Sequence, residues 1–115
     1  MLEGTYRLIS SERDGQDVTD SESQEAQLVI DGDAHDVRAG SDVLAGTHQL
    51  DTDVTPHQID ATDTAGPFAG HTVLGIFKLE GDEFTVCFAA PGQPRPTEFT
   101  TQDGKATLLH VWKRA

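Results

Sequence analysis

The sequence predicts an all-β protein: an antiparallel β-barrel of about eight short strands with one short helical turn, in a single domain spanning residues 1–115. Candidate strands recur at roughly 8- to 12-residue spacing, a pattern typical of barrels and sandwiches. Glycine, proline and aspartate mark the turns between them. No strand is followed by a helical pattern of the length that a βαβ unit needs. The strand count alone fits a sandwich as well as a barrel.

A hairpin at residues 72–89 is the best-defined element. Residues 72–79 carry apolar side chains on both faces, and residues 80–82 (Glu-Gly-Asp) supply the turn, because glycine tolerates positive φ. Residues 83–89 alternate between two faces. One of those faces carries the large apolar residues Phe84, Val86 and Phe88.

The sequence of the N-terminal part predicts a strand, a turn and the short helical turn. Residues 4–12 form the first strand, with Tyr6 and Leu8 on one face. Residues 13–16 form a turn in which glycine adopts positive φ. The helical turn is predicted at residues 20–26, where acidic side chains suit the positive end of a helix dipole. It is too short to be stable alone, so we expect it to pack over one mouth of the barrel.

Four more strands precede the hairpin. Residues 27–30 and 35–38 flank an Asp-Gly-Asp hairpin signal, and residues 43–51 follow the next turn. Residues 57–62 contain a single large apolar side chain, Ile59, which indicates an edge strand.

The C-terminal part is less regular. Residues 63–70 are predicted as a glycine- and proline-containing loop, and Pro94 and Pro96 stiffen a second loop by fixing φ. Residues 97–101 are predicted as a short edge segment or strand. Residues 106–113 form the closing strand.

The run LGIFKLEGDEFTVCFAAPGQPRPTEF at residues 74–99 resembles the signature of a lipocalin-like domain family that is abundant in planctomycetes and also occurs in actinobacteria. The likeness continues in short matches over nearly the whole chain, at residues 3–6, 12–15, 46–47, 59–60, 66–67 and 113–114. The resemblance implies a small lipocalin-like β-barrel. It implies little about chemistry.

Charge excludes two classes of partner. The chain has 20 acidic and 8 basic residues, a net charge of −12. Nucleic acids and anionic membranes both require Lys and Arg partners, so neither is expected to bind. The acidic surface fits a solvated coat that favours solubility, or a docking face for a basic partner.

A single cysteine and the absence of a leader pattern limit the disulfides and the localisation that we expect. Cys87 is the only cysteine, so no internal disulfide is expected, and within a strand it is interpreted as a small packing residue. No basic-then-apolar leader and no long apolar run is present. These features favour a cytoplasmic protein. We expect either a monomer or a homodimer, and no cofactor.

The five histidines are the most informative polar residues. His57 and His71 fall at loop–strand junctions, whereas His35, His48 and His110 fall inside predicted strands. By the resemblance, His35 and His48 stand where the family pattern has aromatic or aliphatic residues. Three inward imidazoles can bind Zn²⁺ or Fe²⁺, or act as acids and bases near neutral pH. The alternative is that each is an ordinary hydrogen-bonded strand histidine, and no metal site is assigned.

Other side chains are candidates for ligand contact. Arg95 lies between two prolines, where it can present a guanidinium to a ligand carboxylate or phosphate, or instead fix its loop through Glu98 or a backbone carbonyl. Aromatic side chains on inward strand positions can fill the core or line a pocket. The predicted ligand-binding residues are Tyr6, His35, Phe77, Phe84, Phe88, Arg95 and Trp112.

Three functions remain open from the sequence. The first is a binding protein that holds a small apolar or amphipathic molecule inside the barrel. The second is a small barrel enzyme of the cyclase or isomerase type, possible in natural-product biosynthesis, with His48, His110 and Tyr6 as catalytic groups. The third is a filled barrel that acts through its acidic surface as an interaction domain.

Overall fold

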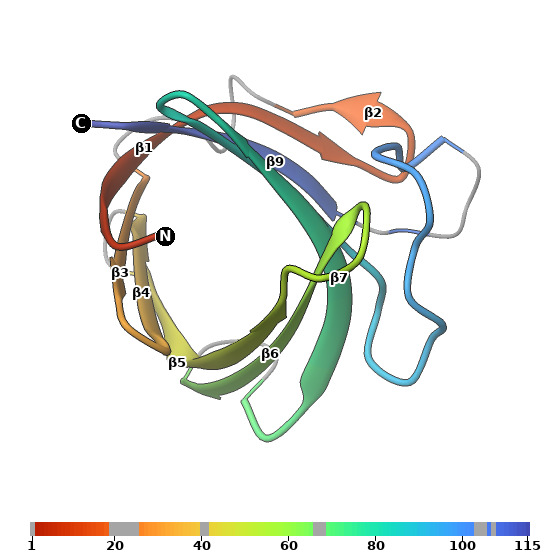
Figure 1. Ribbon diagram of the computed structural model, residues 1–115, viewed down its shortest axis with the longest axis horizontal. Coiled ribbons are helices and arrows are strands. Elements are labelled where there is room, and N and C mark those ends of the chain that lie inside the picture. The colour runs from red at the N-terminus through yellow and green to blue at the C-terminus, as the bar shows by residue number, and fades with distance from the viewer. Residues whose placement is uncertain (1, 19–25, 40–41, 66–68, 103–105, 107) are drawn as a thin grey trace.

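Eight antiparallel strands close into a barrel in the computed structural model, which describes residues 2–18, 26–39, 42–65, 69–102, 106 and 108–115 (Figure 1). One further strand, Gln16–Asp17, lies outside the barrel and pairs with the end of the first strand. The strands are β1 (Gly4–Arg13), β2 (Gln16–Asp17), β3 (Gln27–Asp31), β4 (Ala34–Ala39), β5 (Asp42–Asp51), β6 (His57–Ala65), β7 (Thr72–Glu80), β8 (Glu83–Phe88) and β9 (Leu108–Arg114).

Each barrel strand pairs with its neighbour in the order β1-β3-β4-β5-β6-β7-β8-β9, and β9 pairs back onto β1. The β1–β9 register shifts between Leu8 and Ser10, a bulge that bends β1 around the barrel. This closure confirms the predicted antiparallel barrel and excludes the sandwich. The described part of the chain contains no helix that could span a membrane.

Several details differ from the sequence expectation or lie beyond it. The edge strand predicted at residues 57–62 is wrong, because β6 pairs with both β5 and β7 in the closed barrel. The helical turn predicted at residues 20–26 falls almost wholly on residues 19–25, which lie outside the described residues. Residues 97–101 form no strand, because this segment folds back over the outer face of the sheet and pairs with no edge. The two-residue β2 and the extension of β6 to Ala65 were not predicted. Short or polar strands give little periodic signal.

The inner face of the barrel is packed with apolar side chains from all eight strands. Alternation along each strand places Tyr6, Phe77, Phe84 and Trp112 inside, as the hairpin pattern predicted for residues 83–89. They form one cluster of buried residues, Leu2, Tyr6, Leu8, Ala26, Leu28, Ile30, Ile59, Phe77, Phe84, Val86 and Trp112, packed against Val37, Leu50, Leu79 and Phe88. The largest rings come from β1, β7, β8 and β9, so most of the core volume lies on that side.

A second, smaller core lies outside the barrel wall. Ile76 and Cys87 point outward from β7 and β8, and Phe99 and Ala106 from the long loop after β8 cover them. Cys87 is fully buried there, consistent with a packing role. Lys78 adds a cation–π contact to the Phe99 ring, 5.1 Å from its centroid.

Arg95 ties this loop to the outside of the barrel. Its Nη1 donates to the backbone carbonyls of Ile59 and Gly75, at 3.2 and 2.9 Å, and its Nη2 lies 2.6 Å from Oδ1 of Asp60. Because these partners lie on two strands, the forked guanidinium joins the loop to β6 and β7 at once. These contacts match the loop-fixing alternative considered for Arg95, but its acidic partner is Asp60 and not the expected Glu98.

We expect Arg95→Lys to destabilise the fold by about 1–3 kcal/mol, because an ammonium group cannot reproduce three contacts in a fixed fork. Urea denaturation at pH 7 measures the change. Arg38→Lys is the matched control, since Arg38 pairs only with Asp36 on the exposed surface and its replacement should leave the midpoint unchanged. Equal midpoints for the two variants would contradict the structural role of Arg95.

Candidate functional site

A row of residues on the inner face of β3 to β6 brings polar groups together. The pairing register aligns Ile30 with His35, His35 with Gly46, and Gly46 with Asp63. Residues paired across antiparallel strands point to the same face. His48 follows two residues after Gly46, so it also points inward. Two histidines and one aspartate therefore share one part of the interior.

These three side chains form a continuous chain of contacts. Nε2 of His35 lies 2.8 Å from Oδ1 of Asp63, and Nδ1 of His35 lies 3.2 Å from Nδ1 of His48. The two imidazole rings stack with centroids 5.4 Å apart and planes inclined by 25°. We call this set the Asp63–His35–His48 chain.

Gly46 makes the chain possible. It stands between His35 and Asp63 in the row, and the β5–β6 register shifts between Ala45 and Gly46. A Cβ built on Gly46 would lie 2.1 Å from the Thr62 carbonyl oxygen and 2.7 Å from Cα of Asp63. A side chain there would both clash with the backbone and occupy the space that the imidazole crosses.

The chain is buried and lies beside the β3–β4 turn. His48 is 4% exposed, and the side chains of His35 and Asp63 are 12% and 10% exposed. The backbone N–H of His48 donates to the Asp33 carbonyl at 2.7 Å, which holds the turn against β5. β3 and β4 are shorter than β5, so this turn ends at the level of His48.

The proton positions follow from the donor and acceptor inventory. A carboxylate only accepts, so Nε2 of His35 carries the hydrogen that faces Asp63. A neutral His35 then has a bare Nδ1, so the hydrogen between the two Nδ1 atoms belongs to His48. A neutral His48 is left with a bare Nε2, which is an acceptor. This nitrogen is buried and has no hydrogen-bond partner among the described residues.

Burial lowers the pKa of His48. The main cause is desolvation of the imidazolium, followed by repulsion from His35. The Gly32 carbonyl and the carboxylates of Asp33 and Glu3 act in the opposite direction, but more weakly. His48 is therefore neutral at physiological pH.

The other predicted site residues lie elsewhere. The Tyr6 hydroxyl is fully used: it donates to the Leu2 carbonyl at 2.7 Å and accepts from Nη2 of Arg114 at 2.8 Å. His110 is on the inner face but contacts Trp112 edge-on, at 5.6 Å between ring centroids. No contact joins it to the Asp63–His35–His48 chain among the described residues.

Three predicted aromatic residues belong to the packed interior, and Arg95 does not. Phe77 and Phe84 meet edge to face, with ring centroids 5.9 Å apart. Phe88 lies over Gly75, where a Cβ would approach its ring to 2.6 Å. Arg95 is on the outer face of β6 and β7, away from the interior.

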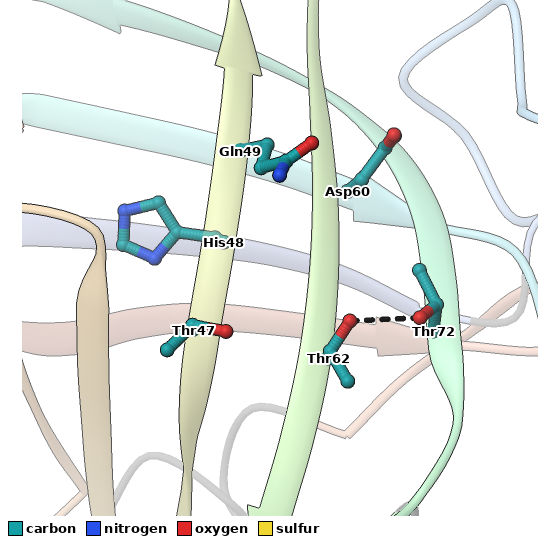
Figure 2. Close-up of a pocket in the computed structure, with 6 residues that line it drawn as sticks. All are labelled: Thr47, His48, Gln49, Asp60, Thr62 and Thr72. Atoms are coloured by element: carbon teal, nitrogen blue, oxygen red, sulfur yellow. Dashed lines mark hydrogen bonds between the residues drawn. The ribbon is translucent and has the colours of Figure 1, made fainter.

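The described pockets are shallow depressions on the outer face. One, of about 270 Å³, lies over β5, β6 and β7, where Thr47, Gln49, Asp60, Thr62 and Thr72 gather. Figure 2 shows that His48 points away from these side chains, on the other side of β5. The second, of about 310 Å³, lies over β3 to β6. The lining of the first depression also includes His48, and that of the second includes His35.

The geometry does not gather a metal-ligand set from the described residues. His35 and His48 face each other through their Nδ1 atoms at hydrogen-bond distance, so their lone pairs do not converge on a third point.

Sequence reasoning found the two histidines but missed Asp63 and Gly46. Asp63 was assigned to a loop, because residues 63–65 are polar and give no strand signal. The available clue was the period of two from Ile59 through Ala61 to Asp63, which continues the inner face.

Comparison with known proteins returned no match to a family model, to a curated protein or to a solved structure.

We expect Gly46→Ala to destabilise the fold by about 1–3 kcal/mol, because the added methyl group overlaps backbone atoms of β6. It should also separate His35 from Asp63. Urea denaturation measures the first effect and the imidazole NMR spectrum the second. Thr47→Ala, at the exposed neighbouring position, should change stability by less than about 0.5 kcal/mol. A Gly46→Ala variant with wild-type stability would contradict the close approach of β5 and β6.

The lowered pKa of His48 predicts a pH dependence of stability. As pH falls below the unfolded value of about 6.5, the unfolded chain binds a proton before the folded chain does. The stabilisation associated with neutral His48 is thus complete above that pH and is lost as pH falls toward the lower, folded pKa. The slope is at most about 1.4 kcal/mol per pH unit for one proton.

Urea midpoints between pH 7.5 and 5 test this. His48→Gln should reduce the slope of stability against pH, and His71→Gln, at an exposed loop position, should leave it unchanged. Equal slopes in wild type and His48→Gln would contradict the assignment.

Proposed function

We propose that this protein is a small-molecule-binding barrel, and that its ligand is mainly apolar and places one hydrogen-bond donor against Nε2 of His48. The observation that carries the proposal is this buried acceptor without a partner among the described residues. A buried polar atom without a partner costs about 1–3 kcal/mol, and native proteins rarely leave one unsatisfied. A ligand N–H or O–H would recover that free energy.

The surroundings of His48 support a small ligand at this position. Its inner-face neighbours include the small residues Gly46 on the same strand, Ala61 beside it on β6 and Val73 beyond on β7, together with Leu50 on β5. Small barrels that bind ligands do so in their interior.

The N-terminal segment lies close to the same position. Leu2 is almost fully buried against the core cluster, and the next residue but one, Gly4, pairs with Ile30, which pairs in turn with His35. In Figure 1 the start of the chain lies within the outline of the barrel. We propose that a ligand reaches His48 at this end, with displacement of the Leu2 side chain.

A proton-transfer enzyme of the cyclase or isomerase type is the second candidate. The observation in its favour is that His48 is a base oriented by His35, which is in turn oriented by Asp63. Such chemistry also requires a donor for the developing negative charge. No hydroxyl or cation among the described residues lies within hydrogen-bond distance of His48 Nε2, so binding is the better supported function.

We also propose, from the resemblance at residues 74–99, that the chain is a lipocalin-like domain. A closed eight-stranded antiparallel barrel is the architecture that this membership requires.

Phenol and toluene test the proposed function, because they share a shape and differ in one hydrogen-bond donor. Each is titrated into the ¹⁵N-labelled chain at pH 7.5 and followed through backbone amide shifts. We expect shifts centred on β4, β5 and β6, and phenol binding at least as tightly as the more apolar toluene. His48→Leu should change the phenol-to-toluene affinity ratio about fivefold to tenfold in favour of toluene, which corresponds to one hydrogen bond.

His110→Leu is the matched control, because His110 faces the interior outside the chain and its loss should leave the ratio unchanged. If His48→Leu fails to fold, His48→Gln replaces it and should retain part of the preference through its amide oxygen. Shifts scattered over the outer face, or a ratio that His48 does not affect, would count against an interior ligand.

A further inference from the structure

We infer that the Asp63–His35–His48 chain takes up a single proton as a unit, and that this proton converts Nε2 of His48 from an acceptor into a donor. The inference rests on the proposed function only for its consequence, which is the class of ligand that the site prefers at each pH. The proton count itself follows from the described contacts.

The count begins with the two contacts inside the chain. Nε2 of His35 faces a carboxylate at 2.8 Å and must carry a hydrogen. The two Nδ1 atoms lie 3.2 Å apart, so one hydrogen lies between them and a second would place N–H against N–H. Two of the three hydrogen positions are thus always filled while the chain is intact. Only the hydrogen position at Nε2 of His48 can be either empty or filled.

Adding one proton therefore has one result wherever the charge resides. If His48 becomes the imidazolium, it carries hydrogen on both nitrogens. If His35 does, its Nδ1–H donates to His48, and the remaining hydrogen of the neutral His48 moves to Nε2. Both forms present an N–H at the ligand position. A second added proton would require the Nδ1···Nδ1 contact to break.

The charge of the site changes with the same proton. The chain carries one negative charge when both rings are neutral and none when one ring is protonated. The other ionisable groups that act on His48 are the carboxylates of Asp33, in the β3–β4 turn, and Glu3, before β1. Both are negative, so neither supplies a cation for an anionic ligand.

The ligand class follows from this count. With neutral rings, the site accepts a hydrogen bond and favours an alcohol, phenol or amide N–H. With the extra proton, it donates and favours a carboxylate or a carbonyl group. Binding of an anion is thus coupled to uptake of one proton, and binding of a hydroxyl compound is opposed by it.

Imidazole NMR of the ¹⁵N-histidine-labelled chain tests the count without any ligand. At pH 8 we expect His48 to be protonated on Nδ1 and bare on Nε2, and His35 to be protonated on Nε2. On acidification one proton should enter, at Nε2 of His48, before any resonance shows loss of the chain. His71, which is exposed, serves as a reference resonance outside the chain. Independent uptake of two protons by the two rings, or a His48 that is bare on Nδ1 at pH 8, overturns the inference.

Substitution of His35 provides a second test of the number of protons that the Asp63–His35–His48 chain binds. His35→Gln removes one histidine but releases His48 from the pair. We expect this variant to bind at least as many protons between pH 8 and pH 5 as the wild type does, counted over its histidine resonances. His71→Gln should bind one fewer. If His35→Gln also binds one fewer, the two rings titrate independently and the inference fails.

Phenol and benzoate test the consequence for binding. As pH falls through the transition seen by NMR, phenol affinity should decrease about fivefold or more while benzoate affinity increases by a similar factor. The His71→Gln variant should behave as the wild type. Affinities that move together, or that ignore the transition, overturn the link between proton and ligand. If neither compound binds at any pH, the proposed function fails, and the NMR count still decides the inference.

Discussion

Pairing between the first and last strands is the constraint on which the structure depends. Residues near the two ends of the chain meet here: Leu8 pairs with Trp112, and Tyr6 with Arg114. Arg114 also donates to the Tyr6 hydroxyl, which itself donates to Leu2, so the seam is fastened by side chains as well as backbone. Without this pairing the sheet would have two exposed edges and no enclosed face. The single apolar cluster from all eight strands exists only because the seam is closed.

Closure also explains how a polar chain is tolerated in the interior. A buried imidazole or carboxylate is costly unless its hydrogen bonds are made. The stagger of the closed sheet aligns Gly46 between His35 and Asp63, and the missing side chain lets these two meet. Each contact inside the chain satisfies both of its partners. Within the chain, the buried atom left without a hydrogen-bond partner among the described residues is Nε2 of His48.

The fold was largely predictable from sequence, because its evidence is local. Alternation in residues 83–89 and the turn residues around Gly32 and Gly81 set the hairpins, and eight of the nine strands were located within a few residues. The helical turn predicted at residues 20–26 falls almost wholly outside the described residues. Residues 97–101, predicted as a short edge segment or strand, instead cover the outer face of the sheet through Phe99.

The site was predictable only in part, because it depends on register. His35, His48 and His110 were singled out together because all three have strand positions. Strand periodicity gives the face of a residue but not its height in the barrel. The height decides that His35 meets His48, while His110 meets Trp112. The position of Asp63 could not be predicted for the same reason, because only its pairing with Gly46 places it in the row.

The Asp63–His35–His48 chain fixes the tautomer of its terminal imidazole, which a single buried histidine does not do. A lone neutral imidazole exists as two tautomers of similar energy, so the nitrogen facing a ligand would be an acceptor in one and a donor in the other. Asp63 removes this freedom at one end, because it accepts only from Nε2 of His35, and the 3.2 Å contact between the Nδ1 atoms passes the constraint to His48. The hydrogen-bonding character of Nε2 of His48 is thereby tied to the proton count of the chain. A carboxylate in direct contact with His48 would lock the tautomer too, but it would place its negative charge one ring closer to that nitrogen. The intervening His35 keeps that charge at a distance in a protein whose net charge is already −12.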